Sequence, residues 1–276
     1  MKPKKNIPQN SICILGIPFD QNSSFQQGPA FAPECIRKSY FSPSSNLWSE
    51  KGLDLESINH LYDLGDIDFT KGTDNFNLIT HSVKNAIDQE CRLICLGGDH
   101  SITFPIIHAH AQKYDRLNIL HLDAHPDLYD SLDGNIYSHA CPFARIMEQK
   151  LAARLVQAGI RTMNGLQRKQ AEKFGVEVNE MKDGTHWMEA LEFHGPVYVS
   201  IDLDCLDPAF APGVSHHEPG GMTTRQVLDI IHQFRGKVIG ADIVEYNPDR
   251  DLNSMTSMVA AKLLKELIAE IYEDTI

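Results

Sequence analysis

Some features are scarce or missing in this sequence, and each absence excludes a class of protein. No window approaches the ~18 consecutive apolar residues that a membrane-spanning helix requires. The basic segment 1–6 is not followed by a signal-peptide core, because the apolar run at 11–16 is short and has the composition of a strand. Positive charge is also scarce: 25 Lys and Arg residues stand against 37 Asp and Glu residues, so the formal net charge is -12. From this charge we expect no nucleic-acid or membrane partner. From the missing signal-peptide core we expect a cytoplasmic location.

Paired cysteine motifs are missing as well. None of the six cysteines forms a C-x-x-C pair, and four of them lie in or beside apolar runs. The cysteines are Cys13, Cys35, Cys91, Cys95, Cys141 and Cys205. This spacing argues against a zinc site built from cysteines and against a disulfide framework. Buried, reduced thiols are the expectation instead.

The sequence does contain a regular alternation of short apolar runs and segments with helical spacing. Predicted strands include residues 13–19, 92–96, 117–120, 196–201 and 237–244. Predicted helices include residues 33–39, 75–89, 138–149, 163–173, 183–193 and 252–272. Strands that alternate with helices indicate an α/β fold with a mainly parallel sheet. We expect residues 1–276 to form a single three-layer αβα domain.

Carboxylates and an imidazole follow the predicted strand 117–120 at alternate positions: Asp123, His125 and Asp127. Side chains at alternate positions of an extended segment point to one side. The carboxyl ends of strands are also where open α/β sheets bind ligands. Mixed oxygen and imidazole donors suit a divalent cation such as Mn²⁺. The alternative is that these residues only cap the polar end of a strand.

Two further segments repeat this arrangement. Asp202 and Asp204 follow the predicted strand 196–201, and His100 follows the strand 92–96 through two glycines. Around one ion, so many carboxylates would repel each other and raise some of their pKa values. Two divalent ions that share carboxylates would neutralise this charge, and such a pair can lower the pKa of a water molecule toward neutrality. The sequence therefore predicts metal-assisted hydrolysis at a carbon centre.

The segments that carry these residues resemble motifs of the ureohydrolase family, which includes arginases and agmatinases. The matching segments are Gly97-Gly-Asp-His-Ser101, Asp123-Ala-His-Pro-Asp127 and Ser200-Ile-Asp-Leu-Asp-Cys-Leu-Asp-Pro208. Residues 137–145, 209–221 and 259–262 are most similar to the plant-type arginase branch, whose sequences lie near agmatinases. The resemblance covers nearly the whole chain. It implies an arginase-like fold and assembly as a homotrimer or homohexamer.

The resemblance also implies two Mn²⁺ ions per chain. The first ion would be held by His100, Asp123, Asp127 and Asp202. The second ion would be held by Asp123, His125, Asp202 and Asp204. Asp123 and Asp202 would thus be shared by both ions.

Three residues are implied to act on the substrate. A hydroxide would attack the guanidinium carbon, while Asp127 hydrogen-bonds it and moves its proton. Glu245 would pair with the planar guanidinium, which suits a carboxylate with two acceptor oxygens. His139 would carry a proton to the leaving amine. The alternatives are an acid at the sheet edge for Glu245 and a loop histidine bonded to its own backbone for His139.

The substrate implied is a small cationic guanidino compound, and the polar loop 129–135 would face its far end. In this loop Asp130 is a candidate for binding an α-amino group and Asn135 an α-carboxylate. His216 and His217 stand where many family members carry Thr-Pro, and they either line the pocket or lie at the surface. His121 belongs either to the core or to the layer behind the metal ligands.

The branch resemblance favours arginase, which would convert L-arginine to ornithine and urea. Agmatinase, which would convert agmatine to putrescine and urea, is the main alternative, and other guanidino acids remain open as substrates. A catalytically silent regulatory subunit is disfavoured because all six ligand positions are filled. A single-zinc deacetylase of similar outline is disfavoured by the Asp202 and Asp204 pair.

Overall fold

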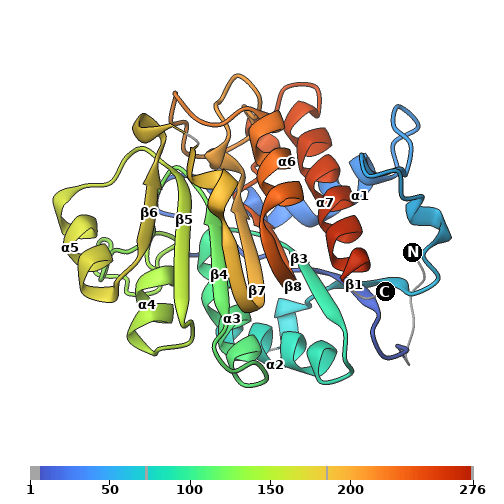
Figure 1. The fold of residues 1–276 in the computed structure, drawn as a ribbon, viewed down its shortest axis with the longest axis horizontal. Helices are drawn as coiled ribbons and strands as arrows, with labels where there is room; N and C mark the ends of the chain where they lie inside the picture. Colours follow the sequence, from blue (N-terminus) through green and yellow to red (C-terminus); the bar gives the residue numbers. More distant parts are fainter. Residues whose placement is uncertain (1–6, 72–73, 185, 275–276) are drawn as a thin grey trace.

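The computed structural model describes residues 7–71, 74–184 and 186–274, and within them eight strands form one parallel sheet (Figure 1). The strands are β1 (Ile12–Gly16), β2 (Leu61–Asp66), β3 (Arg92–Leu96), β4 (Asn118–Leu122), β5 (Arg154–Ile160), β6 (Glu177–Glu180), β7 (Glu192–Asp202) and β8 (Arg235–Val244). Their order across the sheet is β2-β1-β3-β8-β7-β4-β5-β6, and each neighbouring pair is parallel. The predicted α/β class is therefore confirmed.

Helices cover both faces of this sheet (Figure 1). They are α1 (Ala32–Tyr40), α2 (Asn75–Ile87), α3 (Thr103–Ala111), α4 (Pro142–Glu148), α5 (Gly165–Phe174), α6 (Thr224–Gln233) and α7 (Met255–Glu273). Helices α1, α6 and α7 pack together on one face, and α2 to α5 form the layer on the other face. This is the three-layer αβα arrangement that the alternation of strands and helices predicts. No helix within the described ranges is long and apolar enough to cross a bilayer.

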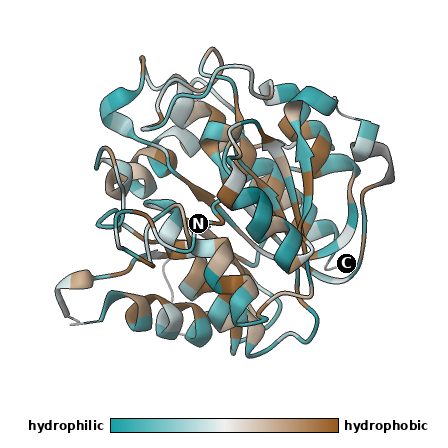
Figure 2. Cartoon of the chain, turned by 90° about the vertical axis from the view of Figure 1, so that its left-hand side faces the viewer, coloured by the Kyte–Doolittle hydropathy of each residue, from teal (hydrophilic) through white to brown (hydrophobic). Residues whose placement is uncertain are grey.

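Both faces of the sheet are buried, which explains why its strands are continuous apolar runs. In β1, Ile12 and Ile14 belong to the core under α1 and α7, whereas Cys13 and Leu15 belong to the core under α2 and α3. Figure 2 shows apolar colour along the inner strands and polar colour on the loops and on parts of the outer helices. The cysteines are free thiols, and all are buried except Cys35, which is half-buried.

Two predicted helices differ from the structure. The described residues of the segment 183–193 form the end of one 3-10 turn (Met181–Asp183), a second 3-10 turn (His186–Ala190) and the start of β7 at Glu192, which pairs with Arg235 of β8. Gly184, with φ of 79°, ends the preceding turn, so no continuous helix forms there. Helix α4 begins at Pro142 rather than at residue 138, because proline is favoured in the first helical turn.

The four strands in the middle of the sheet, β3, β8, β7 and β4, are adjacent neighbours. Their carboxyl ends therefore open onto one rim. The register places Ser200 of β7 between His121 of β4 and Asp242 of β8. Segments that are far apart in the sequence thus deliver their side chains to the same place.

Candidate metal centre

Six predicted metal ligands lie together on this rim. Asp123 directly follows β4, Asp202 is the last residue of β7, and His100 begins the 3-10 turn after β3. The carboxylates are buried, as is His100, whereas His125 is partly exposed. The rest of the set, Asp127 and Asp204, lies in the segments that continue from β4 and β7.

His100 is surrounded by three carboxylates. Its Nδ1 lies 3.2 Å from Asp123 Oδ2, 3.0 Å from Asp127 Oδ2 and 3.2 Å from Asp202 Oδ2. This Nδ1 is buried and makes no hydrogen bond. Neighbouring ligands of an octahedral ion with bonds of ~2.1 Å lie ~3 Å apart. The four donor atoms therefore have the chemistry and the spacing that a divalent cation requires.

A second group of donors lies beside the first. His125 Nδ1 is 3.0 Å from Asp204 Oδ2 and 3.4 Å from Asp123 Oδ1. Burial, together with the nearby charges of Asp204 and Asp123, raises the pKa of Asp202 well above its usual range. This crowding of carboxylates is the effect that a pair of cations would relieve.

Backbone amides orient the carboxylates. Asp123 Oδ1 accepts a hydrogen bond from the backbone N–H of His125 at 2.6 Å, and Asp202 Oδ1 accepts one from Asp204 at 2.8 Å. Asp204 Oδ1 accepts one from Ala124 at 3.1 Å. Each of these bonds fixes one oxygen and leaves lone pairs for a cation.

A buried network that the sequence analysis missed lies behind His100. His100 Nε2 is 3.0 Å from Ser200 Oγ, and the Ser200 hydroxyl donates to Asp242 Oδ1 at 2.6 Å. Thr103 and Tyr198 each donate a hydroxyl to Asp242 Oδ2 at 2.9 Å. Since Ser200 gives its proton to Asp242, its oxygen accepts from Nε2–H of His100. The lone pair of His100 therefore lies on Nδ1, toward the carboxylates. The only sequence signal was an acid inside an apolar strand.

His139 and Glu245 contact each other directly. His139 Nδ1 is 3.1 Å from Glu245 Oε1, which also accepts the backbone N–H of His100 at 2.8 Å. Burial alone would lower the pKa of His139, but the carboxylates of Glu245, Asp127 and Asp99 together raise this pKa to about 9. The second ring nitrogen, Nε2, lies 2.9 Å from Ser24 Oγ. Ser24 lies outside the motifs, so sequence reasoning did not find it.

A cavity of about 150 Å³ lies between these residues and the metal centre. Tyr129, Thr162, Gln167, His139 and His216 contribute to its lining. The His216 ring stacks on His139 at 5.1 Å between centroids, and its buried Nε2 has no hydrogen-bond partner. His216 thus faces the cavity, whereas the exposed His217 bonds the carbonyl of Pro212.

Backbone strain is present at this centre. Asp127 and Glu245 both have left-handed backbones, with φ of 49° and 63°. Such conformations cost energy in residues other than glycine and occur where the surrounding structure enforces them, often at active sites. Here they direct two carboxylates toward the cavity.

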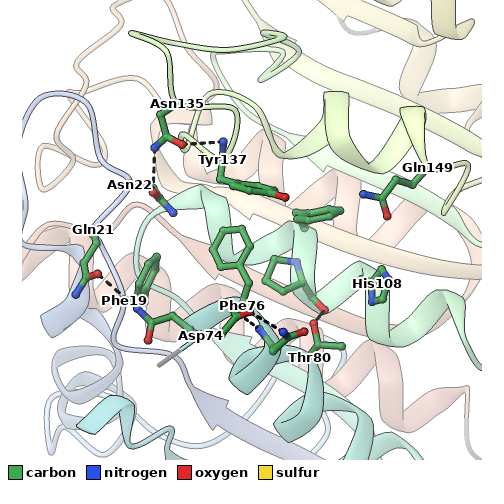
Figure 3. A pocket seen from close by; sticks show the side chains of 14 residues that line it. Phe19, Gln21, Asn22, Asp74, Phe76, Thr80, His108, Asn135, Tyr137 and Gln149 are labelled. Atoms are coloured by element: carbon green, nitrogen blue, oxygen red, sulfur yellow. Dashed lines mark hydrogen bonds between the residues drawn. The ribbon is translucent and has the colours of Figure 1, made fainter. Parts of the chain in front are cut away.

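Two predicted substrate ligands lie elsewhere. The Asp130 side chain is 80% exposed and pairs with Arg145 at 3.2 Å, so it does not line the cavity. Asn135 lines a separate hollow of about 690 Å³, together with Asn22 and Tyr137 (Figure 3). There its amide donates to Asn22 Oδ1 at 3.0 Å and accepts from the Tyr137 backbone at 2.9 Å. Asn135 therefore links its own loop to the segment that contains Asn22.

Plant arginases are among the known proteins most similar to this chain. "Arginase 1, mitochondrial" of Arabidopsis thaliana is 49% identical over 95% of this chain and 81% of that protein. The protein of the same name from Oryza sativa subsp. indica is 48% identical over 95% of this chain and 82% of its own length. The structure of an arginase from Medicago truncatula matches with a TM-score of 0.91 at 44% identity, over 95% of this chain and 87% of that one.

These relatives correct one prediction. The expectation of a cytoplasmic location is wrong, because both sequence relatives are named mitochondrial. The physical reason is that organelle targeting depends on a separate leader segment. The missing secretory signal, on which the expectation rested, therefore carries no information about targeting to mitochondria.

The family assignment rests on the whole chain. The model of the family described as "Arginase family" matches residues 10–269, which include every strand and most of α7. Members of this family depend on metal ions, and the described residues contain two candidate ligand groups that share Asp123. By its sequence, its fold and the residues on the rim of its sheet, this chain belongs to the arginase family.

Proposed function

We propose that this protein is a binuclear manganese ureohydrolase that converts L-arginine to ornithine and urea. The observation that carries the proposal is the buried Nδ1 of His100, which makes no hydrogen bond and lies within 3.2 Å of three carboxylates. The arginase names of the plant relatives support arginine as the substrate.

The residues present fit two ions. One ion would be held by His100 and Asp127, and the other by His125 and Asp204. Both ions would share Asp123 and Asp202. When bound, such ions neutralise the carboxylates and lower the pKa of a water molecule. The aspartates and histidines fix the positions of the ligand atoms through the backbone amides described above.

Three side chains act on the substrate in this proposal. Glu245 binds the guanidinium mainly through Oε2, because Oε1 already accepts from His139 and from the His100 backbone N–H. Asp127 accepts the proton of the attacking water as the new C–O bond forms. His139 donates a proton to the leaving nitrogen as the C–N bond breaks, so that ornithine leaves as a neutral amine before it is protonated by solvent. The contact between His139 and Glu245 supports these two neighbouring roles.

Agmatine is the second candidate substrate. None of the described residues that line the cavity is a lysine or arginine. The α-carboxylate of arginine would therefore be held by neutral donors such as Tyr129, Thr162 and Gln167. Agmatine has no such carboxylate and would place no charge there.

The test is urea release in the presence of Mn²⁺, with arginine, agmatine and shorter guanidino acids compared at equal concentration. We expect arginine to give the highest kcat/KM. A higher kcat/KM for agmatine would replace the arginase proposal by the agmatinase one. Less than one Mn²⁺ per chain after reconstitution, without urea from any substrate, would favour a silent family member.

The assembly is part of the same proposal. We expect a homotrimer or homohexamer, with no nucleic-acid or membrane partner. Light scattering coupled to size-exclusion chromatography measures the mass of the assembly directly. A monomer at micromolar concentration would contradict this expectation.

A further inference from the structure

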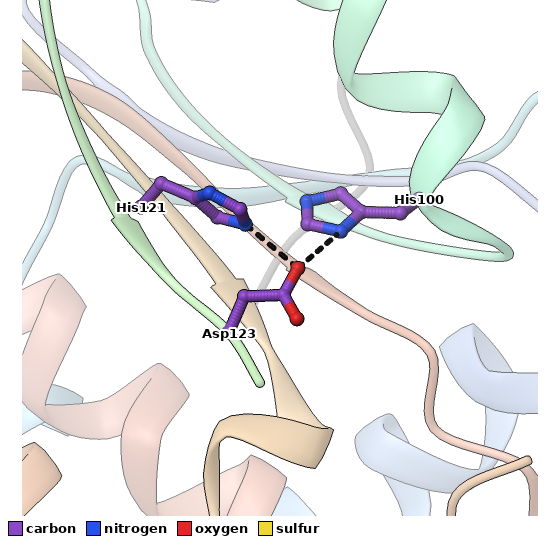
Figure 4. Close-up of side chains that lie close together, drawn as sticks. All are labelled: His100, His121 and Asp123. Carbon is purple, nitrogen blue, oxygen red and sulfur yellow. Dashed lines mark hydrogen bonds and ion pairs between the residues drawn. The ribbon is translucent and has the colours of Figure 1, made fainter. Parts of the chain in front are cut away.

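His121 is a histidine at the metal centre that the proposed ligand set does not use. It lies in β4 two residues before Asp123, is fully buried, and points with His100 toward the Asp123 carboxylate (Figure 4). Donor atoms of these three residues lie within 4.8 Å of one another, so His121 is a candidate ligand by distance alone. Whether His121 is a metal ligand or a hydrogen-bond donor depends on which of its ring nitrogens carries the proton.

Gln157 of β5 fixes that proton. A backbone carbonyl can only accept, so the atom of Gln157 that lies 2.6 Å from the Pro126 carbonyl is the amide nitrogen. The same nitrogen lies 3.0 Å from His121 Nδ1, and it is a donor there as well. Nδ1 is therefore an acceptor without a proton, and the ring proton of the neutral imidazole lies on Nε2. Nε2 is 2.8 Å from Asp123 Oδ2, to which it donates.

A nitrogen that carries a proton has no lone pair for a cation. The other nitrogen, Nδ1, is turned away from the centre toward Gln157, and the ring stacks on Phe143 at 3.9 Å between centroids. To become a ligand, His121 would have to give up its bond to Asp123 and change its tautomer. Gln157 would then place an N–H against another N–H in a fully buried position.

The hydrogen bond from His121 gives the second oxygen of Asp123 a protein donor. Its Oδ1 accepts the backbone N–H of His125 and its Oδ2 accepts Nε2–H of His121. Each oxygen thus has one fixed protein donor and keeps a lone pair on the side of the rim. A carboxylate held at both oxygens in this way is oriented to bridge two cations.

We propose that Gln157 and His121 are positioning residues that orient the shared ligand Asp123, and that His121 is not itself a metal ligand. This inference rests on the proposed function only in requiring that Mn²⁺ binds. Hydrogen-bond partners behind metal ligands commonly contribute 10–100-fold to metal affinity. We expect an effect of about this size from His121.

The test compares Mn²⁺ binding in four variants of the full chain, without using activity. His121→Phe keeps a ring against Phe143 but removes the donor, and His121→Gln restores a side-chain N–H. Gln157→Met removes the group that fixes the tautomer. His232→Phe is the matched control, because His232 also lies 2.9 Å from a carboxylate, Glu266, but it belongs to α6 and contacts neither a proposed ligand nor the network behind His100.

Competition with a chelator gives the affinity, and metal analysis at saturation gives the stoichiometry. We expect His121→Phe to bind Mn²⁺ about 10–100-fold more weakly with two ions still bound at saturation. Gln157→Met should show a smaller loss, and His121→Gln should lie closer to wild type than His121→Phe. An unchanged affinity in His121→Phe would overturn the proposal. The loss of one whole ion at saturation would also overturn it, because His121 would then be a ligand.

A second measurement uses the wild type, so that the proposal can still be tested if a variant fails to fold. Nitrogen-15 NMR of the metal-free wild type reports the protonated ring nitrogen of each histidine, and we expect a neutral His121 with its proton on Nε2. A proton on Nδ1 would contradict the inference. A wild-type chain that binds two Mn²⁺ ions but releases no urea would contradict the proposed function and leave the inference on His121 standing.

Discussion

Ser200 of β7 lies opposite Asp242 of β8 and donates its hydroxyl proton to that carboxylate at 2.6 Å. This bond makes the Ser200 oxygen an acceptor for His100 Nε2–H and keeps the His100 lone pair on Nδ1. We expect Ser200→Ala to weaken Mn²⁺ binding about 10-fold or more, because the His100 tautomer is no longer fixed. Mn²⁺ titration measures this directly. Equal affinity in wild type and Ser200→Ala would show that the network does not act on the metal centre.

Asp202 is expected to be required by both ions. Asp202→Ala should reduce bound Mn²⁺ and urea release together to background, because it removes a ligand that two ions share. Metal analysis and the urea assay on the same preparation give both values. Asp88→Ala, an exposed acid at the end of α2, should change neither value. Full activity in Asp202→Ala would contradict the shared role.

His139 is expected to affect the chemical step alone. His139→Ala should lower kcat about 10²–10⁴-fold, the usual contribution of a positioned acid or base. Bound Mn²⁺ should stay at the wild-type level, since the ring contacts Glu245 and Ser24 rather than a proposed ligand. A parallel loss of metal would instead make His139 a structural part of the centre.

Thr162 offers a test of substrate choice. If its hydroxyl binds the carboxylate end of arginine, Thr162→Val should raise KM for arginine about 5–10-fold, the value of one hydrogen bond. KM for agmatine should not change, because agmatine lacks this group. The same increase in KM for both substrates would show that Thr162 only shapes the cavity and does not bind the carboxylate.

His110 makes folding sensitive to acid. Burial lowers its pKa from the ordinary value of 6.5 to about 4. Between these pH values His110 is therefore protonated in the unfolded chain but neutral in the native state. Stability from this residue is therefore present above pH 6.5 and is lost as the pH falls toward 4, by about 3 kcal/mol in total. Urea unfolding at several pH values should show a weaker pH dependence for His110→Leu than for wild type. His108→Leu, on the same helix but partly exposed, is the control.

The proposed metal ligands could be predicted from the sequence because their chemistry is local. Asp123, His125 and Asp127 follow one strand at alternate positions, and apolar runs mark the strands that bring the other ligands to the same rim. The supporting residues were not accessible in this way. Asp242 faces Ser200 only because β7 and β8 pair in a particular register, which the sequence of either strand does not specify.

Loop geometry explains the remaining differences. The predicted substrate ligands Asp130 and Asn135 have suitable chemistry, but the turn around residues 130–137 points them to Arg145 and Asn22. Ser24 reaches His139 across 115 positions of sequence, so no spacing rule connects them. Side-chain direction in such segments depends on tertiary contacts, and composition alone does not predict it.

The adjacency of β3, β8, β7 and β4 also ties folding to metal supply. The proposed ligands for both ions follow strands that are far apart in the sequence. An ion bound at the rim would therefore cross-link the strands in the middle of the sheet. Ligand binding to the native state alone adds RT ln(1 + [L]/Kd) to its stability. If the bound ions are manganese, as proposed, a shortage of that metal would lower both the activity of the enzyme and the lifetime of its folded chain.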